Sequence, residues 1–263
     1  MSENILTFQE VIDSLAPNQV LPDDLLPSCH TTTVGFMSSI MRCNYAEPQD
    51  CTVFKGEKLL YFFYGKASFL VNEDLSNYTD NPPLTLIYDS NAIDDKTLWR
   101  IMPFDSGGFH RYLARKGFER KNFGYTPGDR SKIIAYIRLI FNNNSQYLED
   151  QISMEDLKKY EERCLEIQEM IKIFKDAKVN TGPQLYSIEL QYQAKVSFTP
   201  THLVIPYDLY TAPFWGKNFK LKYPDIKVEH YGQDEVLKSK GHPLEAFEYQ
   251  RLMREKVKTI IKG

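Results

Sequence analysis

The 263-residue chain lacks a strong charge of either sign, a recognisable secretory signal and any long apolar run. Its 35 acidic and 32 basic residues leave a net charge of −3, which gives no overall attraction to a polyanion. The N-terminal stretch has no basic segment followed by an apolar one, as a secretory signal would. No apolar segment approaches the ~18 residues that a transmembrane helix needs. We therefore expect a cytoplasmic protein that does not enter membranes.

Cysteine is also scarce, and none of the four cysteines belongs to a C-x-x-C pair. Cys29, Cys43, Cys51 and Cys164 therefore do not predict a metal site or a redox motif, and reduced thiols agree with a cytoplasmic location. Cys29 precedes His30, but neighbouring residues on a strand point to opposite faces. This disfavours a thiol nucleophile that the histidine would activate.

Aromatic residues, in contrast, are abundant, with 17 Tyr and 16 Phe. Tyrosine suits walls that are apolar but need a hydrogen-bond partner. The segment KLLYFFYGKASF, residues 58–69, is too continuously apolar for a surface strand and predicts a buried one. Alternation puts Tyr61 and Phe63 on one face and Phe62 and Tyr64 on the other. One of these faces would belong to the core, and the other could stack on a planar ring.

The order of segments predicts an α+β protein with one central mixed or antiparallel sheet and helices inserted between its strands. We interpret residues 1–263 as a single domain with a helical insertion at about 130–178. Within it, 153–175 is expected to form one helix whose apolar residues recur at spacings of three and four. Such a seam packs inside the protein or binds a protein partner.

Two polar blocks stand beside these apolar segments. His30, Thr31 and Thr32 end a short extended segment and open a helix, where the imidazole can donate to a sugar hydroxyl and the threonines can serve a cap or a ligand. Glu189 interrupts an apolar strand in SIELQ. A carboxylate at that place points to water at a sheet edge or projects into a cleft.

A third block, PFDSGGFHRY, places Asp105 and Ser106 before two glycines. This arrangement is typical of a helix N-terminus whose N–H groups could receive a phosphate, or of a turn in which Asp105 caps the helix 107–116. His110 and Arg111 lie one turn further on and could face the same anion.

Together, HTTT running into SSIM, the aromatic strand LYFF and a late strand glutamate resemble the NAD-consuming ADP-ribosyltransferases, above all the DNA-targeting toxins. The resemblance implies an ADP-ribosyltransferase-like fold and NAD as substrate, in a bacterial toxin or phage-defence effector that modifies nucleic acid or protein. Glu189, His30 and Tyr61 would be catalytic, with Glu189 stabilising the ribosyl cation and activating the acceptor. The residues that would bind NAD are Thr31, Thr32, Tyr64, Asp105 and Ser106.

The chain departs from that family in two places, since no clear arginine-plus-asparagine NAD loop follows His30 and the helix 153–175 stands where a loop insertion is expected. The blocks HTTT, YFFYGK and PFDSGG together also resemble a bacterial family of uncharacterised function, which implies no activity.

Two other classes of function remain open. A metal-dependent nuclease would need clustered carboxylates, and SIELQYQAK supplies them poorly because Lys195 is out of phase with Glu189. A non-catalytic interaction protein of a defence system would use the 153–175 seam or the tail. The basic, aromatic segment 214–232 could contact single-stranded nucleic acid, although its acidic residues also suit a solvated surface.

Overall fold

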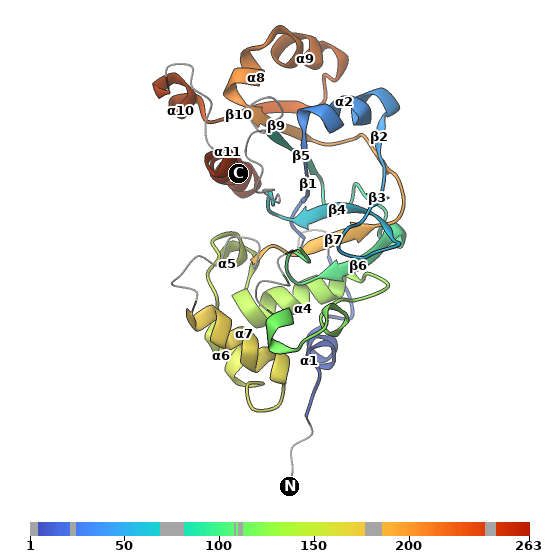
Figure 1. Ribbon diagram of the computed structural model, residues 1–263, viewed down its shortest axis with the longest axis vertical. Helices are drawn as coiled ribbons and strands as arrows, with labels where there is room; N and C mark the ends of the chain where they lie inside the picture. Colours follow the sequence, from blue (N-terminus) through green and yellow to red (C-terminus); the bar gives the residue numbers. More distant parts are fainter. Residues whose placement is uncertain are drawn as a thin grey trace. The chain divides into compact units, whose positions relative to one another are not determined.

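The computed structural model of the protein describes residues 5–21, 25–68, 82–107, 109, 113–176, 186–239 and 246–263. The chain forms two compact units, and each unit gathers segments from separate parts of the sequence (Figure 1). Unit 1 comprises Met1–Leu25, Asp50–Lys58 and Asp94–Gln193, and unit 2 comprises Leu26–Gln49, Leu59–Ile93 and Ala194–Gly263. Helices and a mixed sheet confirm the α+β class, whereas a single domain over residues 1–263 stays a prediction.

Unit 1 is mainly helical. Its helices are α1 (Phe8–Leu15), α4 (Arg130–Phe141), α5 (Asn144–Leu148), α6 (Met154–Lys158) and α7 (Leu165–Asp176), with 3-10 turns at Asp95–Thr97, Ala114–Lys116 and Arg120–Asn122. The expected helical insertion at about 130–178 thus supplies α4 to α7, and α1 packs against α4 and α7. At the start of α1, the Thr7 hydroxyl accepts from the Glu10 N–H while the Glu10 carboxylate accepts from the Thr7 N–H. This exchange satisfies donors that the helix itself leaves without partners.

The core of unit 1 contains a cluster of aromatic rings among its aliphatic side chains. Phe123 contacts Phe8, Phe104 and Phe109, with ring centroids 5.4, 5.3 and 6.0 Å away. These rings come from segments far apart in the sequence. Tilted and edge-to-face contacts of this kind contribute roughly 0.5–1.5 kcal/mol each beyond the burial of apolar area. Many of the aromatic residues of the chain therefore belong to its core.

A pair of antiparallel strands completes unit 1, namely β6 (Leu98–Met102) and β7 (Glu189–Tyr192). Their register places Met102 opposite Glu189 and Arg100 opposite Gln191, with an irregularity between Leu98 and Arg100. Glu189 is therefore the first residue of its strand, and all four residues of β7 are buried.

The expectation of one continuous helix over 153–175 is wrong. α6 ends at Lys158, and main-chain bonds of the turn type follow, such as that from the Arg163 N–H to the Tyr160 carbonyl at 3.0 Å. The chain resumes as a helix only at Leu165. Most of the apolar residues of the seam are nevertheless buried within unit 1: Leu157, Cys164, Ile167, Ile171 and Phe174. This seam therefore packs inside the unit rather than facing a partner.

Unit 2 contains a mixed sheet whose strands follow one another in the order β10–β9–β5–β1–β4. These strands are β1 (Ser28–Thr33), β4 (Lys58–Tyr64), β5 (Pro83–Tyr88), β9 (His202–Pro206) and β10 (Lys227–Tyr231). β9 and β10 run parallel, and the other neighbours are antiparallel. Short strands occur at β2 (Tyr45–Ala46), β3 (Gln49–Asp50) and β8 (Val196–Ser197), and β2 pairs with β8. Every residue of β5 is buried, as its apolar sequence predicts.

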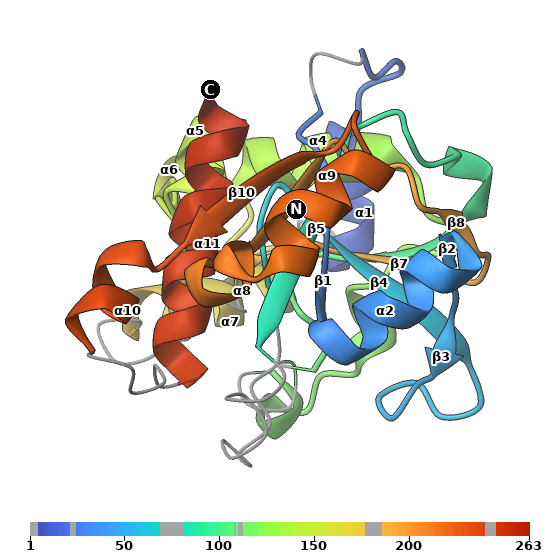
Figure 2. The same cartoon turned by 90° about the horizontal axis from the view of Figure 1, so that it is seen from above.

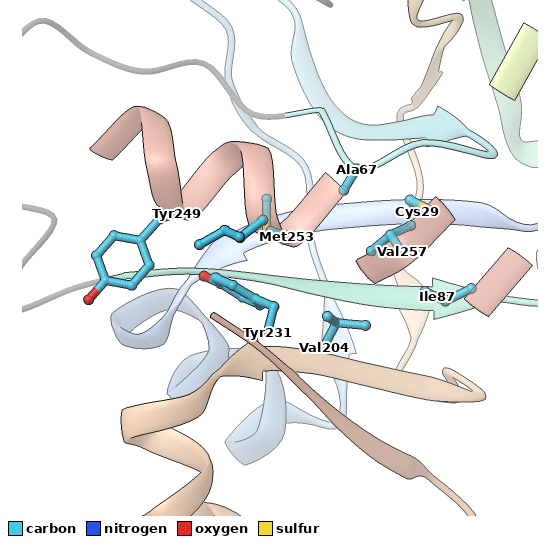
Figure 3. Close-up of a cluster of buried hydrophobic side chains, with 9 residues drawn as sticks. Cys29, Ala67, Ile87, Val204, Tyr231, Tyr249, Met253 and Val257 are labelled. Carbon is cyan, nitrogen blue, oxygen red and sulfur yellow. The ribbon is translucent and has the colours of Figure 1, made fainter. Parts of the chain in front are cut away.

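The helices of unit 2 are α2 (Val34–Cys43), α8 (Tyr207–Thr211), α9 (Phe219–Lys222), α10 (Gln233–Lys238) and α11 (Ala246–Lys262), with a π-helix at Phe214–Asn218. Figure 2 shows α11 lying along the sheet, where it contacts β5, β9 and β10. Between α11 and these strands lies an apolar cluster that includes Met253, Val257, Val204 and Cys29 (Figure 3). In the described part of the chain, no helix combines the length and the apolar character that crossing a membrane requires.

Candidate functional site

Unit 2 contains a cavity of about 300 Å³ at the end of β1, which we call the threonine pocket. Four successive residues of the strand line it, namely His30, Thr31, Thr32 and Thr33. β1 pairs with β5 along all six of its residues, whereas its register with β4 covers only Ser28 and Cys29. The pocket therefore lies where β1 leaves β4.

The helix that follows β1 supplies a second wall of the pocket. Phe36, Ser39, Ile40 and Cys43 of α2 line the cavity, and their spacing puts them on one side of the helix. The side chain of Phe36 is 63% exposed, although it is aromatic. Sequence reasoning missed this face of α2. The helical spacing of Phe36, Ser39 and Cys43 was the available signal, but the exposure of Phe36 is visible only in the structure.

A carboxylate and an unused hydroxyl complete the lining. Glu47 borders the cavity, and its half-exposed side chain forms an ion pair with Lys195 at 3.6 Å. Thr33 occupies the N-cap position of α2 without making the cap hydrogen bond. Among the described residues, its buried hydroxyl has no hydrogen-bond partner. Thr33, which lines the pocket, therefore has a buried hydroxyl whose donor and acceptor are both unused among the described residues.

His30 is held as a neutral ring. Its Nδ1 lies 2.8 Å from the main-chain oxygen of Tyr61, and the ring packs on Phe62 at a centroid distance of 5.1 Å. Burial lowers the pKa of His30, and the hydrogen bond to Tyr61 opposes this effect. Because a carbonyl can only accept, Nδ1 carries the hydrogen and Nε2 is left as an acceptor. His30 is therefore suited to accept from a ligand hydroxyl, rather than to donate to it as the sequence suggested.

The other predicted residues of unit 2 have internal partners. The Thr31 hydroxyl lies 3.0 Å from that of Thr85, which in turn donates to the sulfur of Met253 at 3.2 Å. Tyr64 is 2% exposed, and its hydroxyl oxygen accepts from the Leu26 N–H at 2.9 Å. Tyr61 is half-buried and contributes its carbonyl to His30. Neither tyrosine is among the residues found to line the threonine pocket in the described part of the chain.

Unit 1 contains a buried carboxyl centre around Glu189, which is 2% exposed. The Ser106 hydroxyl donates to Glu189 Oε1 at 2.7 Å, and the Gln191 amide donates to the same oxygen at 2.5 Å. Burial and, to a smaller extent, the charge of nearby Asp105 raise the pKa of Glu189 to about 8, although the hydrogen bonds oppose this shift. Glu189 therefore carries a proton at neutral pH.

Two arginines form hydrogen bonds to the residues that hold Glu189, namely Gln191 and Ser106. Arg100 donates to the Gln191 side-chain oxygen at 2.9 Å and forms an ion pair with Glu57 at 2.9 Å. Arg120 donates to the main-chain oxygen of Ser106 at 3.2 Å. Sequence reasoning missed both arginines, because they come from a strand and a 3-10 turn without a recognisable motif. The pairing of Arg100 with Gln191 across β6 and β7 fixes one of them.

The predicted site residues thus fall into two groups. Glu189, Asp105 and Ser106 belong to unit 1, where the Asp105 carboxylate accepts from the Gly107 N–H at 2.8 Å in a local turn. Unit 2 holds the remaining residues, which are His30, Thr31, Thr32, Tyr61 and Tyr64. That the two groups surround one cavity stays a prediction, and the predicted anion contacts His110 and Arg111 lie outside the described residues.

A comparison with protein-family models, curated proteins and solved structures finds nothing that matches this chain. Within the described ranges, no group of three His, Cys, Asp or Glu side chains is placed to hold a metal ion. The threonine pocket and the carboxyl centre are therefore the basis on which a function can be assigned.

Proposed function

We propose that the protein is an NAD-dependent ADP-ribosyltransferase-like enzyme that holds the nicotinamide-ribose part of NAD in the threonine pocket. One observation carries the proposal. His30, which the resemblance assigns to catalysis, and Thr31 and Thr32, which it assigns to NAD binding, line a single cavity of about 300 Å³. Small-molecule sites span roughly 300–1,000 Å³, so this cavity suits one half of a dinucleotide rather than all of it.

The polar groups of the pocket agree with a ribose as ligand. The Thr33 hydroxyl can both donate and accept, because it has no partner among the described residues. Ser39 adds a second hydroxyl, and Nε2 of neutral His30 supplies an acceptor. The exposed ring of Phe36 offers an apolar face to the planar nicotinamide. A small number of polar groups within an apolar wall is the usual composition of a ligand site.

In the proposed reaction, the bond between ribose C1′ and the nicotinamide nitrogen breaks, and the nicotinamide leaves with the bonding electrons. An oxygen or nitrogen of nucleic acid or protein then bonds to C1′ and gives up its proton to a base. The ribose passes through a cation-like state that a carboxylate stabilises. Glu189 is the proposed carboxylate, and it must lose its proton to act, since its pKa is about 8. The transferase activity of the enzyme would therefore increase as pH rises towards 8.

Glu47 is a second carboxylate for this role, because it lines the threonine pocket itself. The two glutamates can be separated by variants. Glu189→Gln and Glu47→Gln are each incubated with labelled NAD and with DNA, RNA or protein. Loss of one electrostatic contact to the transition state costs on the order of 10²–10³ in rate. Glu155→Gln, at an exposed position of α6, is the control and keeps the full rate.

The pocket itself is tested by a matched pair of substitutions on α2. Both serines are exposed, but only Ser39 lines the threonine pocket, and the Ser38 hydroxyl instead bonds back to the Val34 carbonyl at 3.2 Å. Ser39→Phe fills the cavity and is expected to weaken NAD binding at least tenfold. Ser38→Phe leaves binding within twofold. Equal NAD binding by the two variants in calorimetry contradicts the proposal, as does wild-type protein that neither binds NAD nor cleaves it.

A non-catalytic interaction protein is the second candidate. Its support is an exposed apolar surface on the π-helix and α9, where Phe214 is 47% and Leu221 is 74% exposed. Lys217 and Lys220 lie in the same segment. If NAD is neither bound nor consumed, and Leu221→Lys releases a partner that purifies with the native chain, this second function replaces the first.

A further inference from the structure

We propose that unit 1 contains a second ligand site, which binds the phosphate group of a phosphorylated small molecule. The site is a cavity of about 580 Å³ bordered by residues of α1, β6 and the chain from Arg120 to Lys132, and we call it the arginine pocket. It lies entirely within unit 1 and shares no residue with the threonine pocket. The proposal therefore holds whether or not the protein uses NAD.

The charge of the lining indicates an anion. Arg100, Arg120, Lys121 and Lys132 border the cavity, together with one carboxylate, that of Asp13. Within the lining, Asp13 pairs with Lys132, and outside it Glu57 pairs with Arg100 and Glu119 pairs with Lys121. Counted over the described residues, these four cations and three carboxylates leave one net positive charge at the cavity. Cations that converge on a half-enclosed cavity raise the local concentration of anionic ligands.

The two arginines are fixed before any ligand arrives. Arg100 donates through Nε to the Thr126 hydroxyl at 3.3 Å, in addition to its bonds with Gln191 and Glu57. Arg120 donates to the carbonyls of Ser106 at 3.2 Å and Val53 at 3.3 Å. Groups that are already ordered lose less conformational entropy when they bind. Buried Glu189 supports this order, since Ser106 and Gln191 are both bonded to it.

A neutral group of the same lining adds to the recognition of a phosphate. The Thr126 hydroxyl accepts from Arg100 and so keeps its own hydrogen to donate. A phosphate has several acceptor oxygens, and guanidinium groups bind them through two parallel hydrogen bonds. The pocket therefore combines cations with a hydroxyl donor.

The size of the cavity and one aromatic ring indicate that the ligand is larger than a free phosphate ion. A volume of about 580 Å³ lies within the usual range for organic ligands. Phe54 borders the cavity, with the guanidinium carbon of Arg100 at 4.1 Å and that of Arg120 at 5.6 Å from its centroid. A sugar or a base attached to the phosphate would contact this ring. We therefore expect AMP and ribose 5-phosphate to bind more tightly than inorganic phosphate.

Calorimetric titration of the full chain tests the site with inorganic phosphate, ribose 5-phosphate, AMP and, as an unphosphorylated anion, succinate. Lys121→Gln combined with Lys132→Gln is expected to weaken AMP binding at least tenfold, and Arg120→Met to weaken it further. Lys116→Gln, outside the lining, keeps binding within twofold. Because Arg120 also holds main-chain carbonyls, its variant is used only if its far-UV spectrum is native. The double lysine variant decides the test on its own.

Three results overturn the proposal. They are no binding of any phosphate at millimolar concentration, AMP binding that the double lysine variant leaves unchanged, and succinate binding as tight as that of AMP. Binding that falls at higher salt and in the double variant, with AMP preferred to phosphate, supports it. Since NAD itself contains phosphates, Ser39→Phe is titrated with AMP in parallel. Unchanged AMP binding in that variant assigns the site to unit 1 and leaves the NAD proposal to its own test.

Discussion

Ser106 donates two hydrogen bonds to Glu189, from its hydroxyl to Oε1 at 2.7 Å and from its main-chain N–H to Oε2 at 3.2 Å. One residue thus contacts both oxygens of a carboxyl group that is almost entirely removed from water. These bonds favour the charged form, but burial and the neighbouring Asp105 outweigh them, and the pKa of Glu189 rises to about 8. The centre therefore holds a proton that the unfolded chain would release.

This proton makes the stability of the protein depend on pH. The pKa of Glu189 rises from 4.5 in the unfolded reference to about 8 in the folded protein. Between these values the folded state binds one more proton, so the free energy of unfolding falls as pH rises, by at most about 1.4 kcal/mol per pH unit. The contribution is complete below the lower value and is lost as pH passes through about 8.

Glu189→Gln should remove this dependence, because glutamine resembles the protonated acid and does not titrate. We measure the free energy of unfolding in urea at several pH values between 5 and 8. From pH 5 to pH 8, the stability of the variant relative to the native protein should rise by on the order of 2–4 kcal/mol. Glu155→Gln, at an exposed position, is the control and should follow the native protein. A constant difference between Glu189→Gln and the native protein across this range would show that the carboxyl is ionised throughout.

The ion pair between Arg100 and Glu57 should contribute more to stability than a surface pair. Their side chains are 12% and 29% exposed, and the Trp99 indole also donates to Glu57 at 3.2 Å. Glu57→Gln should therefore lower the free energy of unfolding by roughly 1.5–3 kcal/mol. In the exposed pair of Lys121 with Glu119, Glu119→Gln should cost less than about 1 kcal/mol. Urea unfolding compares the two variants, and equal costs would contradict the difference in burial.

The apolar cluster under α11 should be the most sensitive part of unit 2 (Figure 3). Met253 is fully buried there, and the Thr85 hydroxyl donates to its sulfur. Met253→Ala should cost about 2–5 kcal/mol, because it leaves a cavity in the cluster. Thr259→Ala, on the exposed side of the same helix, should change stability by no more than about 0.5 kcal/mol. Thermal unfolding measures both, and a small effect at Met253 would mean that α11 is held elsewhere.

The elements whose pattern is local could be read from the sequence. The continuous apolar run of residues 58–69 located β4, and the polar and apolar segments in their order predicted the α+β class. The prediction of one continuous helix over 153–175 was wrong because apolar spacing alone does not show where turns interrupt a helix. α6 and α7 each bury their own residues of the seam, Leu157 in α6 and Ile167 and Ile171 in α7, so the apolar spacing looks continuous in sequence.

The candidate sites could be predicted only in part. His30, Thr31 and Thr32 stood out because they are consecutive polar residues that open a helix, and they do line a pocket. Arg100 and Arg120 did not stand out, since their position depends on pairing between β6 and β7 and on carbonyls of distant segments. The sequence likewise does not show that Glu189 is buried, and burial is the main cause of its raised pKa.

The distribution of thiols gives the native chain a built-in reporter of ligand occupancy. Cys43 is exposed and borders the threonine pocket, whereas Cys29 and Cys164 are buried, and burial raises the pKa of both. Because alkylation proceeds through the thiolate, a reagent such as iodoacetamide should modify Cys43 and spare those two. A molecule seated in the pocket would slow that modification, so that mass spectrometry can follow its binding without any engineered label.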